Sequence, residues 1–216
     1  MENRKNITVT AHTGTMGTPM NSLEAIETGI RAGADIVEFD LNFNAEGTAV
    51  LSHNPPQGGE VLFEDALIAV GKHDGIKINI DVKNTLDLVT VEKLIEKHGL
   101  TDRAFFTGIN ENNINELKKQ GVKLPYYLNY YHVIPLFGRK KYYRELAEII
   151  KGHGAVGLNA YLLLINKPLT DYLRSQGLLV SGWTANKERQ MRRLIRCGVD
   201  NITTRHPDVL INILKK

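Results

Sequence analysis

Two acidic side chains stand two positions apart within an apolar segment at 36–43 (IVEFDLNF), namely Glu38 and Asp40. Side chains in an extended chain alternate between two faces, so both carboxylates would point to one side and the apolar residues to the other. Neighbouring carboxylates repel each other unless a cation neutralises them, and their oxygens suit a hard divalent ion. The spacing therefore predicts part of a metal site.

A second segment at 76–83 (IKINIDVK) alternates in the same way and places Asp81 and Lys83 on its polar face. A lone aspartate at a strand end is more simply a solvated charge. The same pattern on two apolar strands favours a metal site instead, built from Glu38, Asp40 and Asp81. Lys83 beside them would balance the charge of a bound phosphate.

Two histidines follow apolar segments and are expected beside these acids: His12 in TAHTG and His53 in GTAVLSHN. Either one alone would be read as a structural histidine. Together, one neutral imidazole could accept a proton and one imidazolium could donate a proton to a leaving oxygen, which describes phosphoryl transfer. Trp183 is the only tryptophan, and it fits a wall of the substrate pocket and core packing equally well.

Strand and helix patterns alternate along the whole chain and would position these residues. Strands are expected at 7–12, 36–43, 76–83, 104–107, 126–129, 156–159, 178–183 and 201–204, with a short strand-like extension at 47–53. Helices are expected at 22–32, 63–73, 86–98, 112–120, 142–151, 169–176, 188–197 and 207–214. Eight strand–helix units predict a single (β/α)8 TIM barrel, with residues 1–216 as one domain and the active site at the carboxyl ends of the strands. A doubly wound sheet is the alternative.

Composition narrows the classes of protein. A length of 216 residues with 42% hydrophobic content suffices for one barrel with a sizeable core, and a net charge of +3 argues against nucleic acid as a partner. No P-loop motif occurs, so nucleotide hydrolysis is unsupported. The single cysteine excludes an intramolecular disulfide, and no apolar run is long enough for a signal peptide or membrane span. We expect a cytoplasmic protein without stable membrane anchoring.

The landmarks of the chain resemble, in order, those of the glycerophosphodiester phosphodiesterase family. AHTG resembles its His-Arg-Gly opening, PMNS its Pro-Glu-Asn-Thr, AGADIVEFDLNF its metal strand and LSHN its His-Asp. INIDVK, GWTANKE and GVDNITTRHPD are similar to its Glu-Ile-Lys, Trp-Thr-Val-Asn and Gly-Val-Asp-Gly-Ile-Thr-Asp-x-Pro stretches. Each match is short, but their order and spacing over essentially the whole chain are specific.

This resemblance implies a TIM barrel with one Mg2+ or Ca2+ ion that hydrolyses a small glycerophosphodiester to an alcohol and a phosphomonoester. It implies Glu38, Asp40 and Asp81 as metal ligands, and His12 and His53 as the catalytic acid and base, without deciding which histidine does which. By the same resemblance Lys83 would contact the phosphate. From its place at the end of an apolar segment, we also count Trp183 among the candidate substrate-binding residues.

Several positions depart from the family pattern. Thr13 replaces the arginine after the first histidine, Met20 replaces the glutamate of Pro-Glu-Asn-Thr, and Asp81 replaces a glutamate. Arg205 stands where the last motif usually has aspartate, and we interpret it as a phosphate contact that compensates for the lost arginine. The stretch between His53 and the next helix is also short, so the family's insertion that recognises glycerol is expected to be missing.

These departures leave two other functions open. A short loop and an unpaired first histidine are similar to the sphingomyelinase D-type phospholipases, in which a substrate hydroxyl attacks phosphorus and leaves a cyclic phosphate. Alternatively, the barrel has lost turnover and binds a phosphorylated ligand. The tyrosine-rich stretch 126–143 would form a lid or an oligomer contact, but the sequence does not specify the oligomeric state.

Overall fold

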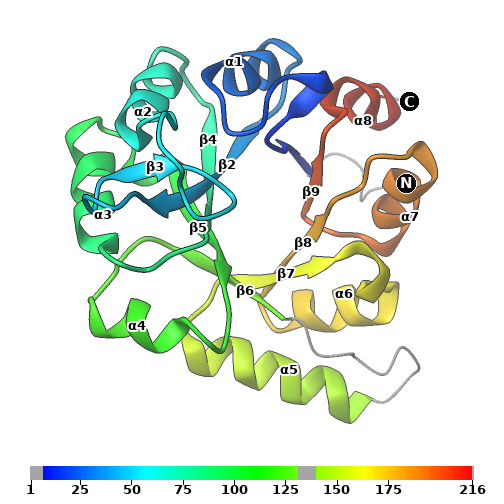
Figure 1. The fold of residues 1–216 in the computed structure, drawn as a ribbon. Helices are drawn as coiled ribbons and strands as arrows, with labels where there is room; N and C mark the ends of the chain where they lie inside the picture. Colours follow the sequence, from blue (N-terminus) through cyan, green and yellow to red (C-terminus); the bar gives the residue numbers. More distant parts are fainter. Residues whose placement is uncertain (1–6, 131–139, 216) are drawn as a thin grey trace.

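The computed structural model describes residues 7–130 and 140–215, which form a closed (β/α)8 barrel (Figure 1). Its sheet has nine strands in the order β1-β9-β8-β7-β6-β5-β4-β2-β3, and the pairing of β1 with β2 closes it. All pairings around the ring of eight strands are parallel. Strand β3 is not part of this ring and pairs antiparallel with the carboxyl end of β2. Closure confirms the predicted barrel and excludes the doubly wound sheet.

The strands are short and alternate with the helices. The strands are β1 (Thr8–Ala11), β2 (Ile36–Phe43), β3 (Ala49–Leu51), β4 (Lys77–Val82), β5 (Ala104–Ile109), β6 (Tyr126–Asn129), β7 (Gly157–Tyr161), β8 (Leu179–Trp183) and β9 (Asn201–Thr204). The helices are α1 (Leu23–Arg31), α2 (Phe63–Gly71), α3 (Leu88–Lys97), α4 (Ile114–Lys119), α5 (Lys140–His153), α6 (Lys167–Ser175), α7 (Glu188–Cys197) and α8 (Pro207–Leu214). The described residues also form the single-turn 3-10 helices η2 (Thr15–Gly17), η3 (Thr101–Arg103) and η4 (Leu162–Leu164).

Polar side chains cap the starts of α1, α3 and α6. Ser22 accepts a hydrogen bond from the backbone N–H of Ala25 at the start of α1, and Asp87 does the same for Thr90 at the start of α3. Such caps satisfy backbone donors that have no partner within the helix. In these three units they fix the residue at which the chain leaves the loop after the strand and begins the helix.

The apolar core lies between the sheet and the surrounding helices, which form the outer ring of Figure 1. Strand β2 illustrates how the core positions the site, because all eight of its residues are buried. Phe39 points outward and meets the ring of Phe63 from α2 edge-on at 5.9 Å, and Leu41 is also in this layer. The alternate residues, Glu38 and Asp40, consequently face the barrel interior.

Most predicted elements agree with the structure to within two or three residues. The tyrosine-rich stretch is an exception, because its central residues 131–139 lie outside the described residues and its interpretation as a lid or oligomer contact is untested. Among the helices that the structure describes, none is both long and apolar enough to cross a bilayer.

Candidate active site

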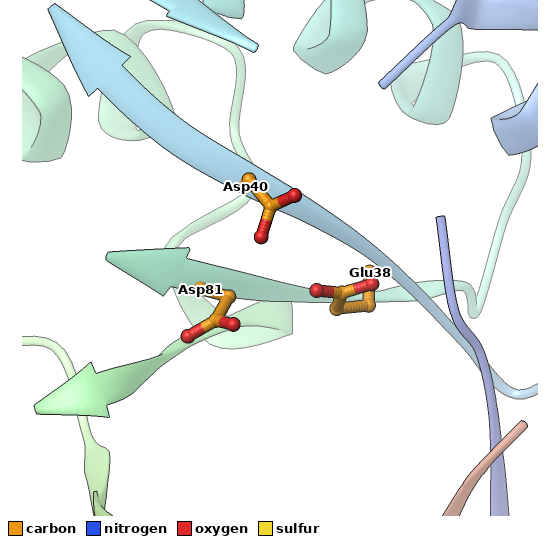
Figure 2. A group of neighbouring side chains, drawn as sticks. All are labelled: Glu38, Asp40 and Asp81. Atoms are coloured by element: carbon orange, nitrogen blue, oxygen red, sulfur yellow. The ribbon is translucent and has the colours of Figure 1, made fainter. Parts of the chain in front are cut away.

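Three carboxylates converge inside the barrel where β2 and β4 run side by side (Figure 2). Asp40 and Asp81 are direct partners in the parallel register of these strands, and Glu38 lies two residues earlier on β2. One oxygen from each residue lies within 4.8 Å of the other two. Glu38 and Asp40 are buried, and Asp81 is half-buried. The cluster could therefore hold a metal ion that is reached from solvent on the side of Asp81.

Lys83 provides the positive charge nearest to this cluster. Its Nζ lies 3.1 Å from Asp40 Oδ1 and 2.6 Å from Asp81 Oδ2. Burial alone would lower the pKa of Lys83, but the two carboxylates raise the pKa above its usual value. Lys83 is therefore a permanent cation that bridges two of the three acids.

The three acids differ in their electrostatic environment. Burial and the negative charges of Asp40 and Asp81 raise the pKa of Glu38 well above its usual range. For Asp40, burial alone would also raise the pKa, but the Lys83 ammonium and the Asn21 amide outweigh this effect and lower the pKa. The cluster as a whole carries more negative charge than Lys83 neutralises, as expected of a cation site.

Asn21 holds the Asp40 carboxylate in place, a role that the sequence interpretation did not assign. Its Nδ2 donates to Asp40 Oδ2 at 2.9 Å, and its Oδ1 accepts from the Asp40 backbone N–H at 3.0 Å. Asn21 adopts a positive φ of 55°, a conformation that asparagine tolerates better than most residues. The sequence did offer a signal for this residue, because Asn21 belongs to the PMNS motif that precedes the predicted metal strand.

Each of the two histidines lies beside one of the carboxylates. His12 Nδ1 lies 2.8 Å from the carbonyl oxygen of Thr13, and because a carbonyl only accepts, the Nδ1–H must donate there. Burial, with the charge of Arg205 as a further cause, lowers the pKa of His12. His53 is more open, with 56% of its side chain exposed, and its Nδ1 lies 3.3 Å from Asp40 Oδ2.

A cavity of about 340 Å³ joins the three carboxylates, Lys83 and the two histidines. It is lined by His12, Glu38, Asp40, His53, Asn79, Asp81, Lys83, Thr107, Asn129, Asn159, Trp183, Thr184 and Thr203. Seven of the eight site residues predicted from the sequence therefore line this one cavity. Trp183 lies at the end of β8 and meets Tyr161 of β7 at 5.8 Å between ring centroids, so a tyrosine that the sequence interpretation missed supports the aromatic wall.

Arg205 is the one predicted residue that does not line this cavity. Its Nε donates to the carbonyl oxygen of Thr13, the residue that follows His12, at 3.1 Å. Thr13 itself is buried, and its backbone N–H donates to Glu38 Oε2 at 2.8 Å. The guanidinium of Arg205 thus stands beside the position whose side chain the family pattern expects to be arginine.

Comparison with known proteins decides the family. The model of the glycerophosphoryl diester phosphodiesterase family matches residues 60–209. The chain belongs to this family. The glycerophosphodiester phosphodiesterase of Caldanaerobacter subterraneus subsp. tengcongensis is 24% identical over 251 aligned residues, which cover 96% of this chain and 98% of the relative. The expected class of enzyme, a phosphoric diester hydrolase, agrees with this membership.

Solved structures show the same barrel. A glycerophosphodiester phosphodiesterase from Parabacteroides distasonis superposes with a TM-score of 0.77 at 20% identity, covering 97% of each chain. An Oleispira antarctica phosphodiesterase, solved in complex with the product sn-glycerol-3-phosphate, superposes with a TM-score of 0.80 at 15% identity, again covering 97% of each chain. At such identities the likeness concerns the fold.

Proposed function

We propose that this glycerophosphodiester phosphodiesterase family member hydrolyses a small glycerophosphodiester to an alcohol and a phosphomonoester, and that it requires one divalent metal ion. The observation that carries the proposal is the convergence of three carboxylates and two histidines on one cavity of the barrel. The Oleispira relative's complex with sn-glycerol-3-phosphate supports the same monoester as a product here.

Glu38, Asp40 and Asp81 would hold the ion, and their donor set fits it. Three carboxylates within 4.8 Å offer only hard oxygen ligands, which Mg2+ and Ca2+ prefer. The contacts of Thr13 with Glu38 and of Asn21 with Asp40 fix two of the ligands before any ion binds. When bound, the ion would stabilise the negative charge that grows on the phosphoryl oxygens.

We assign the general base to His12. Because its Nδ1–H donates to the Thr13 carbonyl, Nε2 carries the free lone pair and can accept a proton from an attacking water. The water oxygen then forms a bond to phosphorus. The same Thr13 contact holds the imidazole in this tautomer.

His53 would then act as the general acid. Its Nδ1 lies 3.3 Å from Asp40 Oδ2, and in the protonated imidazole this nitrogen would donate a hydrogen bond to that carboxylate. The bond between phosphorus and the leaving oxygen breaks, and the proton of His53 passes to that oxygen to release the alcohol. The protons balance: His12 gains one proton from the water, and His53 gives one proton to the leaving alcohol.

Three further residues would interact with the substrate, two from the cavity lining and one from outside it. Lys83 lies between Asp40 and Asp81 and would attract a phosphate oxygen. Trp183 lines the cavity and would form an apolar wall against the substrate. Arg205 would supply, from the end of β9, the positive charge that Thr13 does not provide.

The product of glycerophosphocholine cleavage in 18O-labelled water tests this proposal. With Mg2+ or Ca2+ present, we expect a phosphomonoester that carries one 18O atom, measured by phosphorus NMR and mass spectrometry. A persistent cyclic phosphate without label would replace hydrolysis by the lyase reaction. Binding of a phosphorylated ligand without any cleavage would identify the non-catalytic barrel instead.

A further inference from the structure

Four neighbouring strands of the barrel carry a layer of buried polar side chains. Asn129, Asn159, Ser181 and Asn201 are register partners on the four neighbouring strands β6 to β9, and all four are buried. Barrels of this type usually fill their interior with layers of valine, isoleucine and leucine. Packing alone therefore does not account for three carboxamides and a hydroxyl in this layer.

In one part of this layer the polar side chains hydrogen-bond to one another. Asn201 accepts a hydrogen bond from Thr10 Oγ1 at 2.8 Å and donates to Ser181 Oγ at 2.9 Å. Neither Ser181 nor Asn201 lines the active-site cavity. These polar groups satisfy one another, and they explain how polar side chains are tolerated deep in the barrel.

The other part leaves polar atoms open to the cavity. The backbone N–H of Gly108 donates to Asn129 Oδ1 at 3.1 Å, which fixes the orientation of that amide. Asn159 Nδ2 donates to the same oxygen at 3.1 Å. The carbonyl oxygen Oδ1 of Asn159 must then point away from Asn129, and the residue lines the cavity.

Three such atoms lack a hydrogen-bond partner within the part of the chain that the structure describes: Asn79 Nδ2, Asn159 Oδ1 and Thr203 Oγ1. Their residues are only 4%, 7% and 3% exposed, they line the cavity, and none of the three atoms is enclosed by protein. Thr107 binds the other end of the Asn79 amide at 2.8 Å. Because the three atoms face the cavity and have no hydrogen-bond partner among the described residues, they are free to hydrogen-bond to water or to a ligand that displaces it.

The three atoms define the chemistry of what binds them. They comprise an amide donor, a carbonyl acceptor and a hydroxyl that does both, and all three groups are neutral. Hydroxyl groups both donate and accept, so they match this set, whereas an acyl chain matches none of it. We propose that Asn79, Asn159 and Thr203 form a hydroxyl-binding subsite for the polyhydroxylated arm of the substrate. This specificity role rests on the proposed function and deepens it.

Binding of two matched ligands tests the subsite without turnover. sn-Glycerol 3-phosphate and propyl phosphate differ only in two hydroxyl groups, and calorimetry with Mg2+ or Ca2+ gives both dissociation constants. We expect wild type to bind the glycerol compound about tenfold more tightly, a ratio that one or two buried hydrogen bonds produce. In Asn159→Leu and in the nearly isosteric Thr203→Val, the ratio should fall toward one.

Ser181→Ala is the matched control, because Ser181 is in the same polar layer but outside the cavity. It should keep the wild-type ratio. A ratio near one in wild type, an unchanged ratio in both Asn159→Leu and Thr203→Val, or no binding of either ligand would overturn the subsite. Wild type that discriminates between the ligands but cleaves no diester refutes the proposed function alone, and wild type that cleaves without discriminating refutes the subsite alone.

Discussion

Replacement of Gly108 by alanine should damage both stability and the acidic cluster. Gly108 has a φ of +76°, and a Cβ built on it would lie 2.4 Å from the Val82 carbonyl oxygen and 2.5 Å from Asp81 Oδ1. A left-handed conformation costs an alanine roughly 1–2 kcal/mol, and overpacking typically adds about 1–3 kcal/mol. The free energy of unfolding should therefore fall by about 2–5 kcal/mol in urea denaturation, and the proposed metal should bind more weakly because Asp81 is displaced.

Gly121→Ala separates the two effects. Gly121 has a similar φ of +70°, but a Cβ there would meet nothing within 4 Å. This variant should lose only the conformational part, roughly 1–2 kcal/mol, and keep wild-type metal affinity in calorimetry. Equal destabilisation of the two variants, or unchanged metal binding in Gly108→Ala, would refute the argument that Gly108 is required by the close approach of Asp81.

Three further outcomes are expected. Asp87→Ala should lower the free energy of unfolding by about 1 kcal/mol at pH 7, whereas Asp87→Asn keeps the cap. Since hydrogen bonds from Thr90 lower the pKa of Asp87, the difference between wild type and Asp87→Ala should shrink as pH falls through that lowered value, toward the difference between Asp87→Asn and Asp87→Ala. A difference that grows at low pH would contradict this. Phe63→Ala, at a fully buried ring, should cost about 3–5 kcal/mol in urea denaturation, against about 0.5 kcal/mol or less for the exposed Ile68→Ala. Arg205→Ala should lower kcat/KM about 10- to 100-fold through the loss of a charge-assisted phosphate contact, Arg205→Lys should restore part of it, and unchanged kinetics would remove Arg205 from the mechanism.

The fold was predictable because its signals are local. The helix at 188–197 and the strand at 201–204 have the predicted bounds, since apolar periodicity and a glycine at 198 mark them within one short window. Strand β5 is longer than predicted and continues to Ile109, because Gly108, which interrupts the apolar pattern, stays in the strand and donates to Asn129 across the sheet.

The carboxylates were predictable and the floor of the cavity was not. Glu38 and Asp40 interrupt an apolar alternation, and buried charges are rare enough to be a signal. Asn159 and Thr203 are neutral, and their importance depends on which strand lies beside them and which atoms their neighbours leave unpaired. Tyr161 contacts Trp183 only through the pairing of β7 with β8, which no short window contains.

Metal-dependent turnover of glycerophosphocholine in wild type, Glu38→Gln and Glu64→Gln tests the central claim most directly. Glu64 is the matched control, because it lies on α2 and does not line the cavity. Its carboxylate forms ion pairs with Lys97, the last residue of α3, and with His98, which follows it. We expect wild-type turnover to stop in a chelator and return with Mg2+ or Ca2+, Glu64→Gln to match wild type, and Glu38→Gln to lose about 100-fold or more. Turnover that survives the chelator, or wild-type activity in Glu38→Gln, would contradict the assignment of this carboxylate cluster as the metal site.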